Sequence, residues 1–138
     1  MTSYKLESSL LPIVSRFLLQ HSYAIQVAEM PFFEHRIDLL GYSNLVGASL
    51  AIELKLSKWK RAFEQALIYQ LCTDYSAVAL PRRAAERAER AWFREYGVGL
   101  FAVDQQGEVE ILMSPRRSAS TWPRYRDELA AKLSTGEA

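Results

Sequence analysis

The segment at residues 49–58, SLAIELKLSK, constrains the fold of this chain most strongly, because its apolar and polar residues alternate strictly. Such alternation has the period of a β-strand. The leucines and the isoleucine would face a core, while the opposite side carries small residues followed by Glu53 and Lys55. Residues i and i+2 share a face of a strand, so this carboxylate and this amine project together near the strand's end. Most Glu/Lys pairs of this kind on strands are structural. Whether this pair belongs to a functional site depends on the other residues of the chain.

Length and composition indicate a single globular domain. The 138 residues are enough for a hydrophobic core, and the formal net charge of +1 argues against a strongly basic nucleic-acid-binding protein. Arginines nevertheless gather at residues 82–94 and 116–126, where basic patches and solvated helix faces are equally open interpretations. We expect no membrane segment and a cytoplasmic location, since no apolar run is long enough to span a bilayer and the single Cys72 permits no intrachain disulfide.

Hydrophobic periodicity predicts an α/β chain in which a helix precedes a three-strand meander. Helices are expected at residues 3–20, 57–71, 83–96 and 122–133, and strands at residues 23–33, 36–42, 49–56, 75–80, 98–103 and 108–113. Pro12 predicts either a kink in the first helix or a shorter helix capped by Ser8 or Ser9. Ser57 is the candidate N-cap of the second helix, and Pro31 is expected to end the first strand.

Asp38 is a local misfit. It lies between Ile37 and Leu39 in the second predicted strand, although aspartate is disfavoured in strands and a buried carboxylate without a partner is costly. Such conflicts between a residue and its element are often found at functional sites.

Three cations open the second predicted helix, at Lys58, Lys60 and Arg61. Positive charge at a helix N-terminus opposes the helix dipole, by about 0.3–1 kcal/mol per charge. Basic side chains beside free N–H groups would form a phosphate-binding site. The alternative is a solvated helix face on which water screens the unfavourable charge.

Polar residues follow one another in a fixed order on these elements: Asp38 on the second strand, Glu53-x-Lys55 closing the third, and Gln65-x-x-x-Tyr69 on the next helix. This order resembles the PD-(D/E)XK nuclease superfamily, in particular small single-domain members related to archaeal Holliday-junction resolvases and restriction endonucleases. The resemblance covers roughly residues 5–113, and Ile37 stands where the proline of the family's name would be. The segments that carry it are RIDLL at 36–40, AIELKL at 51–56, AFEQA at 62–66 and VALP at 78–81.

The resemblance implies a restriction-endonuclease-like αβββαβ core with a mixed central sheet flanked by helices. A further helix, a hairpin and a short terminal helix would follow within the same domain, residues 1–138. It also implies that Asp38 and Glu53 hold a divalent metal and that Lys55 assists the attacking water. Glu7 would correspond to the first-helix glutamate that joins the metal site in many members.

Further roles are implied for the second helix, where Gln65 and Tyr69 would support the site or touch the nucleic-acid backbone. Lys58, Lys60 and Arg61 would add phosphate contacts. The residue types suit this chemistry, because two hard carboxylates favour Mg²⁺ or Mn²⁺ and leave positions open for water and phosphate oxygen. A desolvated Lys55 would deprotonate or orient the water, and a protonated one would stabilise the transition state.

Three functions remain open from the sequence. The first is a metal-dependent nuclease that hydrolyses the phosphodiester bonds of DNA in defence, recombination or repair, as a homodimer or with a partner subunit where both strands are cut. The second is a non-catalytic nucleic-acid- or partner-binding subunit on the same fold. The third is a small-molecule-binding α/β protein, which no glycine-rich phosphate loop and no Ser/His/Asp constellation supports.

Overall fold

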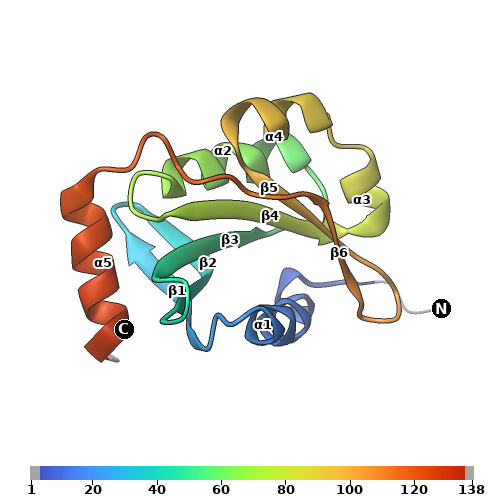
Figure 1. Ribbon diagram of the computed structural model, residues 1–138. Helices are drawn as coiled ribbons and strands as arrows, with labels where there is room; N and C mark the ends of the chain where they lie inside the picture. Colours follow the sequence, from blue (N-terminus) through green and yellow to red (C-terminus); the bar gives the residue numbers. More distant parts are fainter. Residues whose placement is uncertain (1–3, 136–138) are drawn as a thin grey trace.

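A computed structural model of the chain describes residues 4–135. Six strands form one mixed sheet in sequence order, β1 to β6 (Figure 1). The strands are β1 Ile25–Phe32, β2 His35–Ser43, β3 Ala48–Leu54, β4 Tyr75–Pro81, β5 Gly99–Val103 and β6 Val109–Met113. Antiparallel pairing joins β1, β2 and β3 into the predicted meander, parallel pairing joins β3, β4 and β5, and β6 returns antiparallel to β5. The predicted α/β class with a mixed sheet is confirmed.

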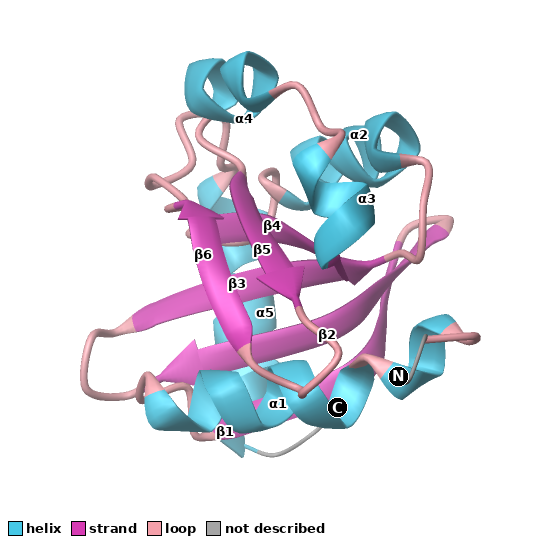
Figure 2. Ribbon diagram, turned by 90° about the vertical axis from the view of Figure 1, so that its right-hand side faces the viewer, coloured by secondary structure: helices cyan, strands magenta, loops and turns pink. Residues whose placement is uncertain are grey.

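Helices cover both faces of this sheet. The helices are η1 Glu7–Ser9, a 3-10 turn, α1 Leu11–Gln20, α2 Trp59–Tyr69, α3 Arg82–Glu86, α4 Arg90–Tyr96 and α5 Pro123–Thr135. Figures 1 and 2 show α1 on one face, α2, α3 and α4 on the other, and α5 beside β1. Among residues 4–135, no helix has the length and apolar character needed to cross a membrane.

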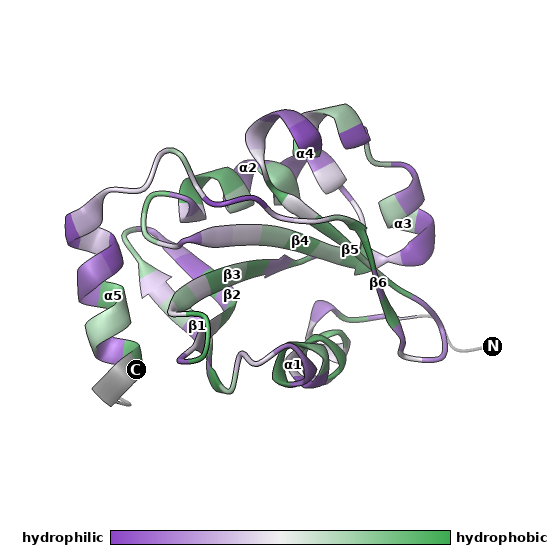
Figure 3. Cartoon of the chain, viewed as in Figure 1, coloured by the Kyte–Doolittle hydropathy of each residue, from purple (hydrophilic) through white to green (hydrophobic). Residues whose placement is uncertain are grey.

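Strand β3 is buried on both of its faces. Leu50, Ile52 and Leu54 pack against α1, as the alternation predicts, and Ala51 on the opposite face lies in a second apolar cluster with Tyr69. The face that carries Glu53 is therefore covered and not solvated. The reason is its central position, with β2 and β4 as neighbours and helices above and below (Figure 3). A carboxylate on β3 is consequently held inside the protein.

Two helix starts differ from the predictions. The shorter first helix is correct, with Pro12 in the first turn of α1, but neither Ser8 nor Ser9 caps it, because both lie in the preceding 3-10 turn. The N-cap of α2 is Lys58 in the left-handed conformation, with φ 58, and not Ser57. Neither helix has a side-chain hydrogen bond at its N-cap.

The predicted helix at residues 83–96 is two short helices, α3 and α4. The chain leaves the helical conformation after Glu86 and resumes it after Glu89, which is extended. The break turns Phe93 toward Phe63 of α2, with 5.0 Å between the ring centroids. Burial of this ring outweighs the helix-favouring sequence between the two segments.

Pro31 lies within β1 and pairs with Arg36, so it does not end the strand. It is tolerated because β1 is an edge strand, where a missing N–H breaks no pairing on the open side. Two glycines take up left-handed positions at the ends of elements. Gly97 ends α4 with φ 71, and Gly107 closes the β5–β6 turn with φ 81.

Candidate active site

Asp38 and Glu53 meet where strands β2 and β3 separate. The antiparallel pairing ends at Leu39 and Ile52, so Asp38 and Glu53 are the next residues opposite each other and share a face of the sheet. The Asp38 carboxylate takes over the role of a backbone carbonyl, because its Oδ2 accepts the N–H of Leu54 at 2.8 Å. The separated strand ends thus place two carboxyl groups side by side.

The two carboxyl groups strongly influence each other's ionisation. The pKa of Glu53 is raised to about 8, chiefly by burial; the hydrogen bond from Tyr69 opposes this rise, and the neighbouring Asp38 adds to it. Burial also raises the pKa of Asp38, while hydrogen bonds from Leu54 N–H and from the Glu53 carboxyl lower it. At neutral pH, and without a cation, the pair therefore holds a proton on Glu53. A divalent cation would stabilise the doubly ionised form in place of that proton.

Tyr69 lies behind the pair and fixes Glu53. Its hydroxyl is 2.6 Å from Glu53 Oε1 and 2.7 Å from the carbonyl oxygen of Arg36 on β2. The side chain is 1% exposed. Burial and the adjacent carboxylates raise the pKa of Tyr69, so its phenol stays protonated. Of the two roles that the resemblance implies for Tyr69, contact with a nucleic-acid backbone is incompatible with this burial, and support of the site agrees with it.

Lys55 projects from the end of β3 toward the same pair and meets Glu7. Its charge lowers the pKa of both Asp38 and Glu53, which places it within electrostatic reach of the two carboxylates. Its Nζ lies 3.9 Å from Glu7 Oε2, with the two side chains 24% and 49% exposed. Glu7 also raises the pKa of Asp38, so the 3-10 turn before α1 brings a third carboxylate to the edge of the site.

The residues fit a divalent metal that keeps most of its water ligands. Among residues 4–135, no group of three His, Cys, Asp or Glu side chains is arranged to hold a metal ion, so a cage made of protein ligands alone is absent from this part of the chain. Mg²⁺ is commonly held by one or two carboxylates together with waters and substrate phosphate oxygens. Asp38 and Glu53 supply that number. Glu7 lies at the edge of the site in contact with Lys55, and its role as a further metal ligand stays a prediction.

The other predicted site residues lie on α2. Gln65 is half-buried and makes no side-chain hydrogen bond within residues 4–135, so its catalytic role stays a prediction. Lys58, Lys60 and Arg61 are exposed at the start of the helix. Lys60 Nζ lies 5.7 Å from the ring centroid of Trp92 on α4, a distance typical of a cation–π contact.

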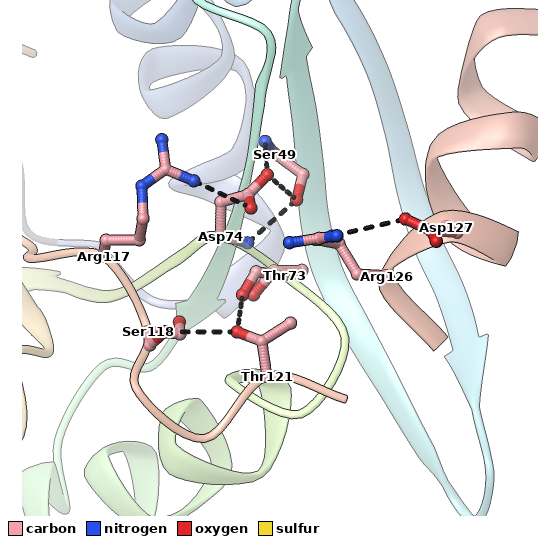
Figure 4. A network of polar contacts seen from close by, with 8 residues as sticks. All are labelled: Ser49, Thr73, Asp74, Arg117, Ser118, Thr121, Arg126 and Asp127. Carbon is pink, nitrogen blue, oxygen red and sulfur yellow. Dashed lines mark hydrogen bonds and ion pairs between the residues drawn. The ribbon is translucent and has the colours of Figure 1, made fainter. Parts of the chain in front are cut away.

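A second buried carboxylate, missed by the sequence reasoning, lies at the opposite end of β3 (Figure 4). Asp74 Oδ2 accepts the backbone N–H of Ser49 at 2.9 Å, and Asp74 Oδ1 is 3.1 Å from Nη1 of Arg117. The N–H of Ser118 donates to the Asp74 carbonyl at 2.7 Å. This network attaches the segment before α5 to the sheet. No sequence signal links Asp74 with Ser49, because an aspartate before a strand is an ordinary turn residue.

Comparison with known proteins identifies the fold and leaves the activity open. No protein-family profile matches the chain, and no curated protein matches its sequence. Among solved structures, a protein of unknown function from Silicibacter pomeroyi is similar, with a TM-score of 0.69 and 25% sequence identity, over 92% of this chain and 82% of that chain. The chain is an α/β protein. Any statement of its activity therefore depends on the geometry of the site.

Proposed function

We propose that this chain is a divalent-metal-dependent nuclease that hydrolyses phosphodiester bonds of DNA. The observation that supports it is the meeting of Asp38 and Glu53 at the separated ends of β2 and β3, within reach of Lys55. Glu53 is buried and Asp38 is half-buried, and two carboxylates this close together are unfavourable unless a proton or a cation compensates them. An arrangement with this electrostatic cost, on elements whose order resembles a nuclease superfamily, favours a metal-binding role over a structural one.

Asp38 and Glu53 would hold the metal, Mg²⁺ or Mn²⁺. Such a cation supplies a Lewis acid that neutralises phosphate charge and makes its bound water more acidic. Tyr69 would keep the Glu53 carboxylate in one orientation, and the Leu54 N–H would do the same for Asp38. Fixed ligands reduce the reorganisation needed when substrate arrives.

Lys55 would act on the phosphate beside the metal. Its ion pair with Glu7 is made by the ammonium form, which supports stabilisation of charge that develops on the phosphoryl oxygens. With the side chain 24% exposed, Lys55 remains accessible to a bound strand. The Glu7 carboxylate limits the positions that the flexible lysine can occupy.

The test is incubation of the purified protein with four substrates: plasmid DNA, single-stranded DNA, branched DNA and RNA. Each substrate is tested in Mg²⁺, in Mn²⁺ and in EDTA. We expect cleavage of DNA in the presence of a metal and none in EDTA. The resemblance implies products with 5′-phosphate and 3′-hydroxyl ends. A single site cuts one strand, so nicking of plasmid before linearisation is expected of a monomer, and concerted linearisation of a dimer. Binding of DNA without cleavage in either metal would refute the nuclease proposal in favour of a non-catalytic binding subunit.

A further inference from the structure

A solvent-open cleft lies beside the candidate site, at the end of the sheet where β3, β4 and β5 finish. Its volume is about 640 Å³, within the range of pockets that enclose small ligands. Four segments distant in sequence form its walls: the β3–α2 turn, α3, the β5–β6 turn, and the N-terminal segment at Tyr4. Figure 1 shows α3 and the β5–β6 turn at the same end of the sheet.

Two arginines on one wall have no side-chain partner in the described part of the chain. Arg83 on α3 and Arg87 at its end line the cleft and are exposed, and neither side chain makes a hydrogen bond or ion pair with another residue in the 4–135 range. Their spacing of four residues places them on one side of the helical turn. Arg82, in contrast, is paired with Glu110 on β6. The free guanidinium groups of this wall are therefore those of Arg83 and Arg87.

Two acidic residues, Asp104 and Glu86, also line the cleft. Asp104 already serves the β5–β6 turn, because its Oδ1 accepts the backbone N–H groups of Gln106 and Glu108, both at 2.9 Å. Glu86 lies on α3 between the two arginines and offsets one of them. The charges of Arg83 and Arg87 are therefore balanced by those of Asp104 and Glu86, and what the cleft offers a phosphate group is two unpaired, fork-shaped donors.

The remaining lining suits a planar apolar group with polar edges. Leu56, Pro81 and Val103 supply apolar surface, and Gln105 on the β5–β6 turn supplies an amide. The ring of Tyr4 also lines the cleft and is held in place by a hydrogen bond of 2.6 Å from its hydroxyl to the Asp104 carbonyl. Aromatic and apolar surface beside cations is the composition of sites that bind unpaired nucleotides.

We propose that this cleft binds one unpaired nucleotide of a nucleic-acid strand, its phosphate on Arg83 and Arg87 and its base against the apolar wall. Leu56 in that wall directly follows Lys55, and the Lys55 N–H donates to Ala79 of β4 at 3.2 Å. A strand seated in the cleft would therefore continue to the carboxyl pair. The substrate assignment rests on the proposed nuclease function, and it favours single-stranded or branched DNA over an intact duplex, whose bases are stacked inside.

Binding is measured by fluorescence anisotropy of labelled single-stranded DNA and of the matching duplex, in EDTA, so that no cleavage occurs. The cleft variant is Arg83→Gln with Arg87→Gln. The matched control is Arg90→Gln with Arg94→Gln, which removes equal charge from exposed positions of α4 outside the cleft. We expect about a tenfold loss of single-strand affinity in the cleft variant and less than about a twofold loss in the control. The slope of log affinity against log salt should flatten by about 1.4 for two lost phosphate contacts.

A second variant acts from the opposite wall and leaves α3 intact. Gln105→Glu with Gln106→Glu adds negative charge at exposed positions of the cleft and should weaken single-strand binding at least as strongly as the arginine variant. Equal losses in the cleft and control variants would overturn the proposal, as would equal losses for duplex and single strand. Competition by a deoxynucleoside 5′-monophosphate distinguishes a free nucleotide from a nucleotide within a strand. If the cleft variants bind the free nucleotide more weakly than the parent but bind the strand equally well, the assignment of the cleft to a strand is overturned.

The cleft and the carboxyl pair are tested separately by these measurements. Cleavage in Mn²⁺ by the parent and by Asp38→Asn reports on the metal site, whereas anisotropy in EDTA reports on the cleft. Absence of cleavage by the parent in Mn²⁺, with intact, cleft-dependent strand binding, would contradict the nuclease proposal alone. Metal-dependent cleavage by the parent, together with a single-strand affinity that is the same in the parent and in both cleft variants, would contradict the cleft proposal alone.

Discussion

The hydroxyl of Tyr69 on α2 lies 2.6 Å from Glu53 Oε1 at the end of β3, inside the protein. The same hydroxyl is 2.7 Å from the Arg36 carbonyl on β2. One phenol therefore joins the helix to both strands that carry the carboxyl pair. Its hydrogen bond also lowers the pKa of Glu53 and so favours the carboxylate that a metal requires.

Tyr69→Phe should destabilise the protein by about 1–3 kcal/mol, because Glu53 Oε1 and the Arg36 carbonyl lose a buried donor. It should also weaken Mn²⁺ binding at neutral pH, since the pKa of Glu53 rises further. Urea denaturation and a metal titration measure the two effects. Tyr96→Phe is the matched control, because Tyr96 is 54% exposed and should change stability by less than about 0.5 kcal/mol. Identical behaviour of the two variants would contradict the supporting role of Tyr69.

The metal-free protein should lose stability as the pH rises from about 4.5 to about 8. The pKa of Glu53 is raised from 4.5 to about 8 on folding, so in this window the folded state holds a proton that the unfolded state has lost. Stability then falls by up to about 1.4 kcal/mol per pH unit, and the loss is complete above the folded-state pKa. Denaturant titrations in EDTA across this range measure the slope.

Glu53→Gln should remove this pH dependence and be more stable than the parent at pH about 8, because the neutral amide replaces a carboxyl group that the fold keeps protonated. Glu64→Gln serves as the control, since Glu64 is exposed on the same helix as Tyr69. A parent whose stability is independent of pH in EDTA, or a Glu53→Gln variant that follows the parent's slope, would be inconsistent with a shared proton at the pair.

Replacing Lys58, Lys60 and Arg61 with glutamine should weaken binding to duplex DNA of any sequence and flatten its salt dependence. Loss of three phosphate contacts reduces the slope of log affinity against log salt by about 2.7. Folding stability should be unchanged or slightly higher, because each cation at a helix N-terminus costs about 0.3–1 kcal/mol.

The control for this triple variant removes the same charge elsewhere, at Arg16, Arg90 and Arg94, which are exposed. Filter binding at several salt concentrations compares the two proteins. If the α2 variant binds DNA like the parent at low salt, its cations form only a solvated face.

Asp74→Ala should destabilise the protein by about 2–3 kcal/mol and leave the cleavage rate per folded molecule unchanged. The variant leaves the buried N–H of Ser49 without an acceptor, but it acts at the far end of β3 from Glu53. Arg117→Gln should cost less than about 1 kcal/mol, because the Arg117 side chain is 56% exposed and its ion pair is screened. Thermal unfolding and single-turnover assays separate the two effects, and a rate loss in Asp74→Ala would show that the network reaches the site.

The sequence predicts most of the sheet, because strand alternation and strand order depend on local patterns. The alternation of residues 49–56 identifies β3, and a misplaced aspartate identifies Asp38 before any partner is known. The break between α3 and α4 is not predictable in this way. Its sequence favours a continuous helix, and only the packing of Phe93 on Phe63, thirty residues earlier, explains why the chain turns.

The sequence predicts which residues form the candidate site, but it does not predict the contacts that these residues make. Glu53 and Lys55 share a face by strand geometry, but the burial of Glu53 follows from helices on both sides of the sheet. The contact of Lys55 with Glu7 depends on how the 3-10 turn is placed. The arginine-lined cleft is assembled from four segments distant in sequence, and no spacing rule relates them.

The measurement that tests the central proposal most directly is cleavage of labelled single-stranded DNA in Mn²⁺ by the parent, Asp38→Asn and Glu53→Gln, with thermal unfolding as a check on folding. We predict metal-dependent cleavage by the parent, a loss of at least about a hundredfold in each variant, and folded protein in all three cases. Variants that cut as fast as the parent would contradict the assignment of Asp38 and Glu53 as the catalytic metal site.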